Sequence, residues 1–266
     1  MNTSLGPPDR TAGVIAAGFL GAILINIPVY SWIFGRDWDW AQGFPLGWLG
    51  TGLVYMSTFF HELGHTVFAW FYGYPTLPSF DFEHGGGMAW MMTGQQIVIL
   101  LCVWAAMGYG IYFFREHRAL QVLIGLLLVF NLATAFNEDH RLTVINFMGP
   151  GFEPLTGGLL LYRALANLAA PRPGERFASA LFGFGMIFRA MIDGWGLLHS
   201  GLHRLEYYNQ KGSHGFGDFD KIADALPFMT FNGVVVIWLC LSVASLAGVF
   251  ALWFVAGRHN TEEINA

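Results

Sequence analysis

Five long stretches of the sequence carry no charged side chain, and this feature most constrains how the chain can fold. They are residues 11–35, 41–60, 88–114, 119–137 and 225–257. About 20 consecutive apolar residues suffice for a helix to cross the hydrocarbon core of a bilayer. Only 12% of the 266 residues are charged, whereas a typical soluble domain has about 25%. The sequence therefore predicts an integral, multi-pass membrane protein, without indicating which membrane holds it.

Seven hydrophobic segments can be followed along the chain. They lie near residues 12–34, 46–72, 94–114, 119–137, 142–168, 177–200 and 228–256. The fifth contains Gly149, Pro150, Gly151 and Pro154, so it is a candidate for a broken or re-entrant segment. We therefore expect an all-α polytopic membrane protein with six or seven transmembrane segments. Residues 1–266 are expected to form a single integral membrane domain.

Two connections interrupt this helical pattern. Within about 74–93, residues 79–83 (SFDFE) alternate polar and aromatic side chains, which is the periodicity of a strand. Glycines at 85–87 follow as a turn signal, so a small β-like insertion is expected there. The longest polar connection spans about 201–224.

The charge of the chain bears on its partners. The net charge is −5, and no basic cluster is interleaved with aromatic residues, so nucleic acid is not an expected partner. The lipid bilayer is the expected surrounding of the hydrophobic segments.

The motif HELGH, residues 61–65, stands inside the second hydrophobic segment. No proline occurs from 46 to 74, which favours a helix. Four-residue spacing then places His61 and His65 on one helical face, where both imidazoles can bind one metal ion. Zinc prefers such nitrogen ligands and lowers the pKa of a bound water to roughly 7. Glu62 is correctly placed to act as the general base toward that water.

HELGH in a membrane helix, followed by a short β-like insertion, resembles the site-2 protease family of intramembrane zinc metalloproteases. The resemblance implies a metalloendopeptidase that holds one zinc per chain and cleaves a membrane-embedded or membrane-proximal peptide bond. Its substrate would be a membrane protein or peptide. In that family the β-insertion helps to hold the substrate in an extended form, and an exposed strand edge could do this by β-augmentation.

The family's second motif is Asn-x-x-Pro followed shortly by Leu-Asp-Gly, whose aspartate is the third zinc ligand. The nearest stretch here is 146–158, with Thr156 in place of that aspartate. Glu153 lies three residues earlier, on the same face of a helix, and is the only charged residue between Arg141 and Arg163. Glu153 is therefore the preferred third ligand. His140, in the polar stretch 137–141, is the rival.

Two other functions remain open at this point. His199 and His203 form a second pair with four-residue spacing. Together with His61 and His65 they could hold two irons, as the histidine boxes of membrane desaturases and hydroxylases do. A non-catalytic metal-binding membrane scaffold is the third possibility.

Overall fold

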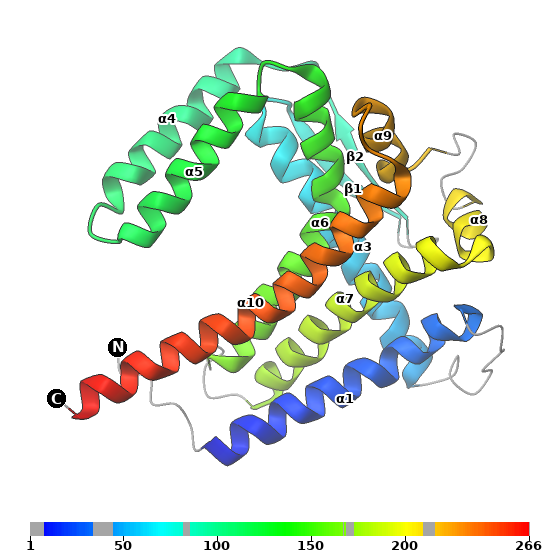
Figure 1. The fold of residues 1–266 in the computed structure, drawn as a ribbon, viewed down its shortest axis with the longest axis vertical. Coiled ribbons are helices and arrows are strands. Elements are labelled where there is room, and N and C mark those ends of the chain that lie inside the picture. Colours follow the sequence, from blue (N-terminus) through cyan, green and yellow to red (C-terminus); the bar gives the residue numbers. More distant parts are fainter. Residues whose placement is uncertain are drawn as a thin grey trace. The chain divides into compact units, whose positions relative to one another are not determined.

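The computed structural model describes residues 8–33, 45–81, 86–166, 168, 173–209 and 216–265, and it is mostly helical. Its elements are α1 (Pro8–Ile33), α3 (Leu46–Phe71), β1 (Thr76–Phe80), β2 (Gly87–Met91), α4 (Ile97–Phe113), α5 (Arg118–Thr134), α6 (Glu138–Leu165), α7 (Pro173–His199), α8 (Gly201–Asn209), α9 (Asp218–Ala225) and α10 (Phe231–Asn265) (Figure 1). Each of the seven predicted hydrophobic segments is helical, and the small two-stranded sheet lies within the predicted insertion. Residues 82–85 of that insertion lie outside the described residues.

Two of the described helical segments are long and apolar enough to cross a membrane, namely Gly174–His199 and Phe231–Val255. The expected six or seven spans are not supported on this criterion. Three other apolar segments, Ala12–Ile27, Ile97–Phe113 and Arg118–Thr134, are shorter. The helices α3 and α6 are also long, but both contain polar residues that lower their mean hydropathy. In α3 these are the residues of the HELGH motif, and in α6 they are the charged residues near its start.

The contacts divide the chain into two compact units, and the first comprises residues 1–57, 150–217 and 232–266. In this unit α1 runs alongside α7 (Figure 1). The ring of Phe19 meets the rings of Phe184 and Phe188 edge-on, at centroid distances of 5.4 and 5.5 Å. The buried amide of Asn26 donates a hydrogen bond to the carbonyl of Gly185 at 3.3 Å. Aromatic packing and one interhelical hydrogen bond thus join the two helices.

The helix α6 continues through Pro150 and Pro154, although the sequence suggested a break there. Pro154 has no N–H, so the carbonyl four residues earlier, that of Pro150, loses its helical donor. The indole of Trp238 in α10 donates a hydrogen bond to this carbonyl at 2.8 Å. A side chain from another helix therefore satisfies the backbone group that the proline leaves free.

The second unit comprises residues 58–149 and 218–231. Here α4 and α5 form a helical hairpin. Asn131 of α5 accepts a hydrogen bond from the indole of Trp104 at 2.7 Å and donates one to the carbonyl of Phe71, the last residue of α3, at 2.9 Å. A buried apolar cluster lies beside these contacts. Its members are Ala69, Tyr72, Tyr74, Leu100, Ala135 and Ile145.

The end of α3 is closed by Gly73, whose φ of 81° lies in the left-handed region. The N–H of Gly73 bonds to the carbonyl of Trp70, and the N–H of Tyr74 bonds to the carbonyl of Ala69. This pair of bonds is a Schellman motif, in which glycine is the usual residue. A Cβ at Gly73 would also lie 2.8 Å from the carbonyl oxygen of Gln96.

The strands β1 and β2 pair antiparallel, with Thr76 opposite Met91 and Phe80 opposite Gly87. The indole of Trp70, near the end of α3, donates a hydrogen bond to the carbonyl of Thr76 at 2.7 Å. This bond fixes the start of β1 against the helix that carries the HELGH motif.

Substitution of Gly73 by alanine is expected to destabilise the protein. The left-handed conformation costs a residue with a Cβ about 1–2 kcal/mol, and the contact with the Gln96 carbonyl adds to this. The measurement is the shift in thermal unfolding temperature of the purified protein. Gly108→Ala is the matched control, because a Cβ at Gly108 meets nothing within 4 Å. Equal melting temperatures for the two variants would contradict the assignment.

Candidate metal site

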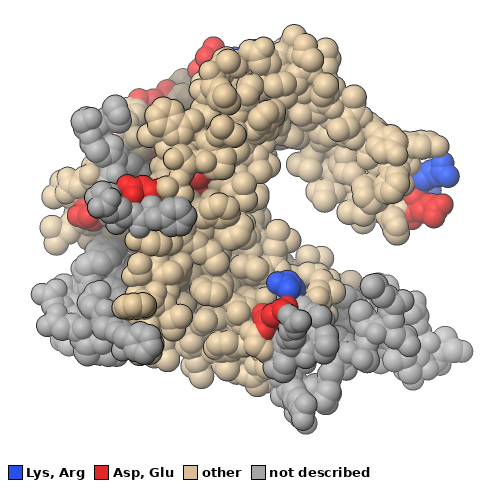
Figure 2. All heavy atoms as spheres, turned by 180° about the vertical axis from the view of Figure 1, so that it is seen from behind, with Lys and Arg blue, Asp and Glu red and all other residues tan. Residues whose placement is uncertain are grey.

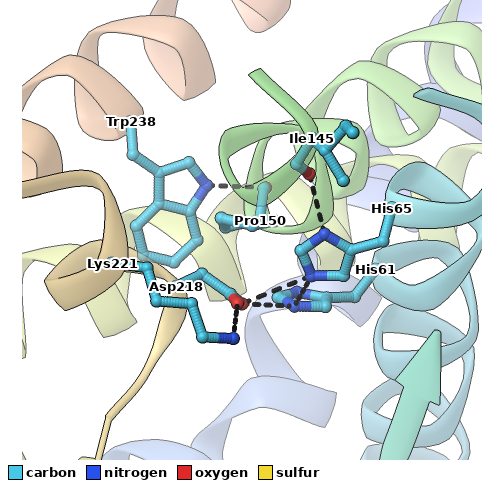
Figure 3. A network of polar contacts seen from close by, with 7 residues as sticks. All are labelled: His61, His65, Ile145, Pro150, Asp218, Lys221 and Trp238. Carbon is cyan, nitrogen blue, oxygen red and sulfur yellow. Dashed lines mark hydrogen bonds and ion pairs between the residues drawn. The ribbon is translucent and has the colours of Figure 1, made fainter. Parts of the chain in front are cut away.

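His61, His65 and Asp218 point toward one another within the second unit (Figure 3). The Oδ2 atom of Asp218 lies 3.0 Å from Nε2 of His61 and 3.4 Å from Nε2 of His65. The two Nε2 atoms are 3.1 Å apart. This group of three side chains could hold a metal ion.

The three separations fit a tetrahedral zinc ion. Ligand atoms about 2.0–2.1 Å from tetrahedral zinc lie roughly 3.3 Å from one another. The distances of 3.0, 3.1 and 3.4 Å are close to that value. A single shared proton can join only one pair of these atoms well, whereas a divalent cation can satisfy all three. The donor set therefore fits a metal ion with one coordination position left open.

The backbone of α6 orients one of the two imidazoles. Nδ1 of His65 lies 2.8 Å from the carbonyl oxygen of Ile145. A carbonyl can only accept, so Nδ1 carries a proton, and Nε2 is the nitrogen that gives up its proton when a metal ion binds. Metal-binding histidines are characteristically held in this way.

The electrostatics of Asp218 favour an ionised carboxylate. Burial by itself would raise the pKa of this carboxyl group. The positive charge on the imidazole of His65, together with hydrogen bonds to His61 and His65, outweighs burial and holds the pKa well below its ordinary value. A metal ion would supply the same kind of positive charge, so the carboxylate is in the form that metal binding requires.

Glu62 lies between the two histidines in sequence and is buried. Its side chain packs against the backbone of Gly87, the first residue of β2. A Cβ at Gly87 would lie only 2.4 Å from Cγ of Glu62. Glycine therefore allows the strand to approach the glutamate of the HELGH motif directly.

Gly149 of α6 provides a similar close approach to the imidazoles. A Cβ at this position would lie 2.2 Å from Nε2 of His65 and 2.8 Å from Nε2 of His61. A side chain at position 149 would therefore fill the space beside the two Nε2 atoms, and glycine leaves that space open.

Asp218 was not identified from the sequence, where it appeared as part of the polar connection 201–224. It is the first residue of α9, an eight-residue helix in which Phe219 and Ile222 are buried. The sequence feature that could have drawn attention to Asp218 is its position at the start of a short amphipathic pattern. That signal does not indicate which other side chains the carboxylate meets, because Asp218 is 157 residues from His61.

The two residues considered from the sequence as third ligands are placed differently. Glu153 belongs to the first unit, is buried, and accepts a hydrogen bond from the hydroxyl of Ser57. His140 is exposed near the start of α6, where its backbone N–H is bonded to the side chain of Asn137. Among the described residues, neither belongs to the metal-capable group.

The second histidine pair lies in the first unit. The ring of His199 stacks on Trp195 at a centroid distance of 3.8 Å. Nε2 of His203 lies 3.7 Å from Oδ1 of Asp193, which also pairs with Arg189. Over the part of the chain that the structure describes, neither histidine joins a group of three metal-capable side chains.

Gly149→Ala is expected to weaken metal binding by about tenfold or more, since the methyl group would displace the imidazoles from their shared orientation. Zinc affinity of the purified protein, measured by competition with a chromophoric chelator, tests this. Gly158→Ala in the same helix is the control, because its Cβ would make only an ordinary contact, 3.4 Å from the Val249 side chain. Unchanged affinity in Gly149→Ala would count against the site.

Single alanine substitutions of the three candidates, Asp218, Glu153 and His140, can identify the third ligand. Asp218→Ala is expected to reduce the metal content of the purified protein to background, because two imidazoles alone hold an ion weakly. Glu153→Ala and His140→Ala are expected to keep it. The measurement is elemental analysis of the metal bound per chain. Loss of metal in Glu153→Ala with full retention in Asp218→Ala would reverse the assignment.

No protein-family model, curated protein or solved structure matches the chain. The donor chemistry of His61, His65 and Asp218 is therefore the basis on which a function can be proposed.

Proposed function

We propose that the protein is an intramembrane zinc metalloendopeptidase that cleaves a membrane-embedded or membrane-proximal peptide bond. The observation that carries this proposal is the convergence of His61, His65 and Asp218 around one point, with Glu62 on the same helix. Asp218 takes the place of third ligand for which the sequence favoured Glu153 or His140. The resemblance of HELGH and the following β-insertion to the site-2 protease family supports the same reading.

Zinc is the metal that best suits the whole group. Two histidines and one carboxylate form a catalytic zinc set with an open position. The same donors also suit mononuclear iron(II) in oxygenases. The glutamate directly after the first histidine favours zinc, because a general base is needed for hydrolysis and has no comparable role in oxygen activation.

The chain's own residues account for the proton transfers of peptide hydrolysis. When bound, zinc would supply Lewis-acid activation of a water molecule and of the scissile carbonyl. Glu62 accepts a proton from the attacking water and then donates it to the leaving amine. The Ile145 carbonyl holds His65 in an orientation in which its Nε2 would be directed at the zinc ion.

The small sheet supports a peptide substrate. Among the described residues the sheet has two strands, so each strand pairs on one side and has a second backbone edge. An extended peptide can add to such an edge through main-chain hydrogen bonds. The contact of Gly87 with Glu62 places the start of β2 directly beside the proposed base.

The surface supports a multi-pass position in a membrane. The helices α4 and α5 have 17 residues each, near the lower end of the roughly 17–25 that a span requires. Large apolar side chains project outward from both: Val98 is 68% exposed, Tyr109 65% and Val129 64%. Acidic and basic groups are sparse on the described surface in Figure 2. Lipid is the surrounding that suits such side chains, because soluble proteins rarely expose apolar patches of this extent.

The competing functions have less support. A di-iron enzyme would need His199 and His203 beside the first pair, yet their rings contact Trp195 and Asp193. A metal-binding scaffold would need no base at Glu62. Elemental analysis separates the metals: about one zinc per chain fits the peptidase, whereas iron fits an oxygenase.

Glu62→Gln is expected to lower the rate of peptide cleavage by about 10²–10⁴-fold, the usual contribution of a general base, while zinc content stays unchanged. The assay is cleavage of single-span membrane peptides by the protein reconstituted in liposomes. Glu116→Gln, at the exposed turn between α4 and α5, is the control. Full activity in Glu62→Gln would exclude the general-base role, and an inactive wild-type protein with a filled site would favour the scaffold.

A further inference from the structure

The two oxygens of the Asp218 carboxylate have different partners (Figure 3). Oδ2 faces the imidazoles of His61 and His65. Oδ1 lies 3.4 Å from Nζ of Lys221. Residues three apart in a helix share a face, so Lys221 approaches the carboxylate from the same side of α9.

The packing of α9 fixes this arrangement. Phe219 and Ile222 of this helix are buried. The ring of Phe219 meets that of Phe231 edge-on, with centroids 5.9 Å apart. These contacts set the rotation of the helix, so Asp218 and Lys221 are presented to the metal site together.

A carboxylate with nothing on its second oxygen can turn either oxygen, or both, toward a cation. An ammonium group on Oδ1 leaves Oδ2 as the oxygen that faces the imidazoles. Lys221 is 49% exposed, so the high dielectric constant of the surrounding water reduces its repulsion of a nearby metal ion. A favourable effect of Lys221 on metal binding requires that its orienting effect on the carboxylate exceed this repulsion.

We propose that Lys221 is a positioning residue, which holds Oδ1 of Asp218 so that Oδ2 is presented to the metal ion. This rests on the proposed metal site, and it requires no contact between Lys221 and a substrate. Groups that hydrogen-bond to metal ligands typically contribute 10–100-fold to metal affinity or activity. An ordinary surface ion pair, by contrast, would stabilise α9 slightly and leave metal affinity unchanged.

The test measures zinc affinity of the purified full chain in detergent, by competition with a chromophoric chelator. Lys221→Met keeps the length of the side chain and removes its charge, and it is expected to bind zinc about tenfold more weakly. Lys221→Arg is expected to restore affinity, because a guanidinium can still donate to Oδ1. Asp224→Asn is the control, since it also changes one charge on α9, at an exposed position three residues after Lys221.

Zinc affinity in Lys221→Met that equals or exceeds the wild-type value would overturn the proposal. The proposal would also be overturned if Lys221→Arg bound zinc as weakly as Lys221→Met. The loss of affinity would then be explained by a less stable α9 and not by the loss of a cation beside Oδ1. Thermal unfolding of each variant shows whether the fold is kept. Zinc affinity is measured without any substrate, so unchanged affinity in Lys221→Met would leave the peptidase proposal intact. Full cleavage by Glu62→Gln would contradict the role of Glu62 and leave the proposed role of Lys221 intact. A wild-type protein that binds no zinc would overturn both.

Discussion

Two imidazole nitrogens and a carboxylate oxygen lie within 3.4 Å of one another in the second unit, an arrangement that could hold a metal ion, and the neighbouring elements of that unit pack closely against it. The helix α3 supplies the nitrogens from two residues whose four-residue spacing brings them close together on one helical face. Neighbouring elements contact these side chains closely. The carbonyl of Ile145 orients His65, Gly149 leaves room beside the rings, and Gly87 lets the strand β2 approach Glu62. Small residues and backbone groups thus surround the charged ones.

The local features of this arrangement could be predicted from the sequence. Hydrophobic segments bounded by polar residues predicted the positions of seven long helices among the described residues, since a helix that buries or embeds its surface needs a largely apolar stretch. Alternation after residue 78 indicated the small sheet. The spacing of His61 and His65 indicated a shared ligand face, because four residues make slightly more than one helical turn.

The contacts between distant segments could not be predicted in the same way. A third metal ligand has no fixed spacing to the histidines. Glu153 was preferred from the sequence because it is the only charged residue between Arg141 and Arg163, whereas Asp218 gave no distinguishing pattern. The continuity of α6 depends on Trp238, which donates to the carbonyl that Pro154 leaves free. The proline by itself suggests a break. In both cases a residue far away in the sequence decides the outcome.

The distance along the chain between His61 and Asp218 has a topological consequence. An ion bound by both would close a loop of 157 residues, acting as a reversible cross-link that a chelator can open. The entropic cost of closing a loop rises slowly with its length, by only about 0.6 kcal/mol for each doubling. The intervening chain could therefore lengthen or shorten in related proteins with little effect on coordination, provided that α9 still returns its aspartate to α3.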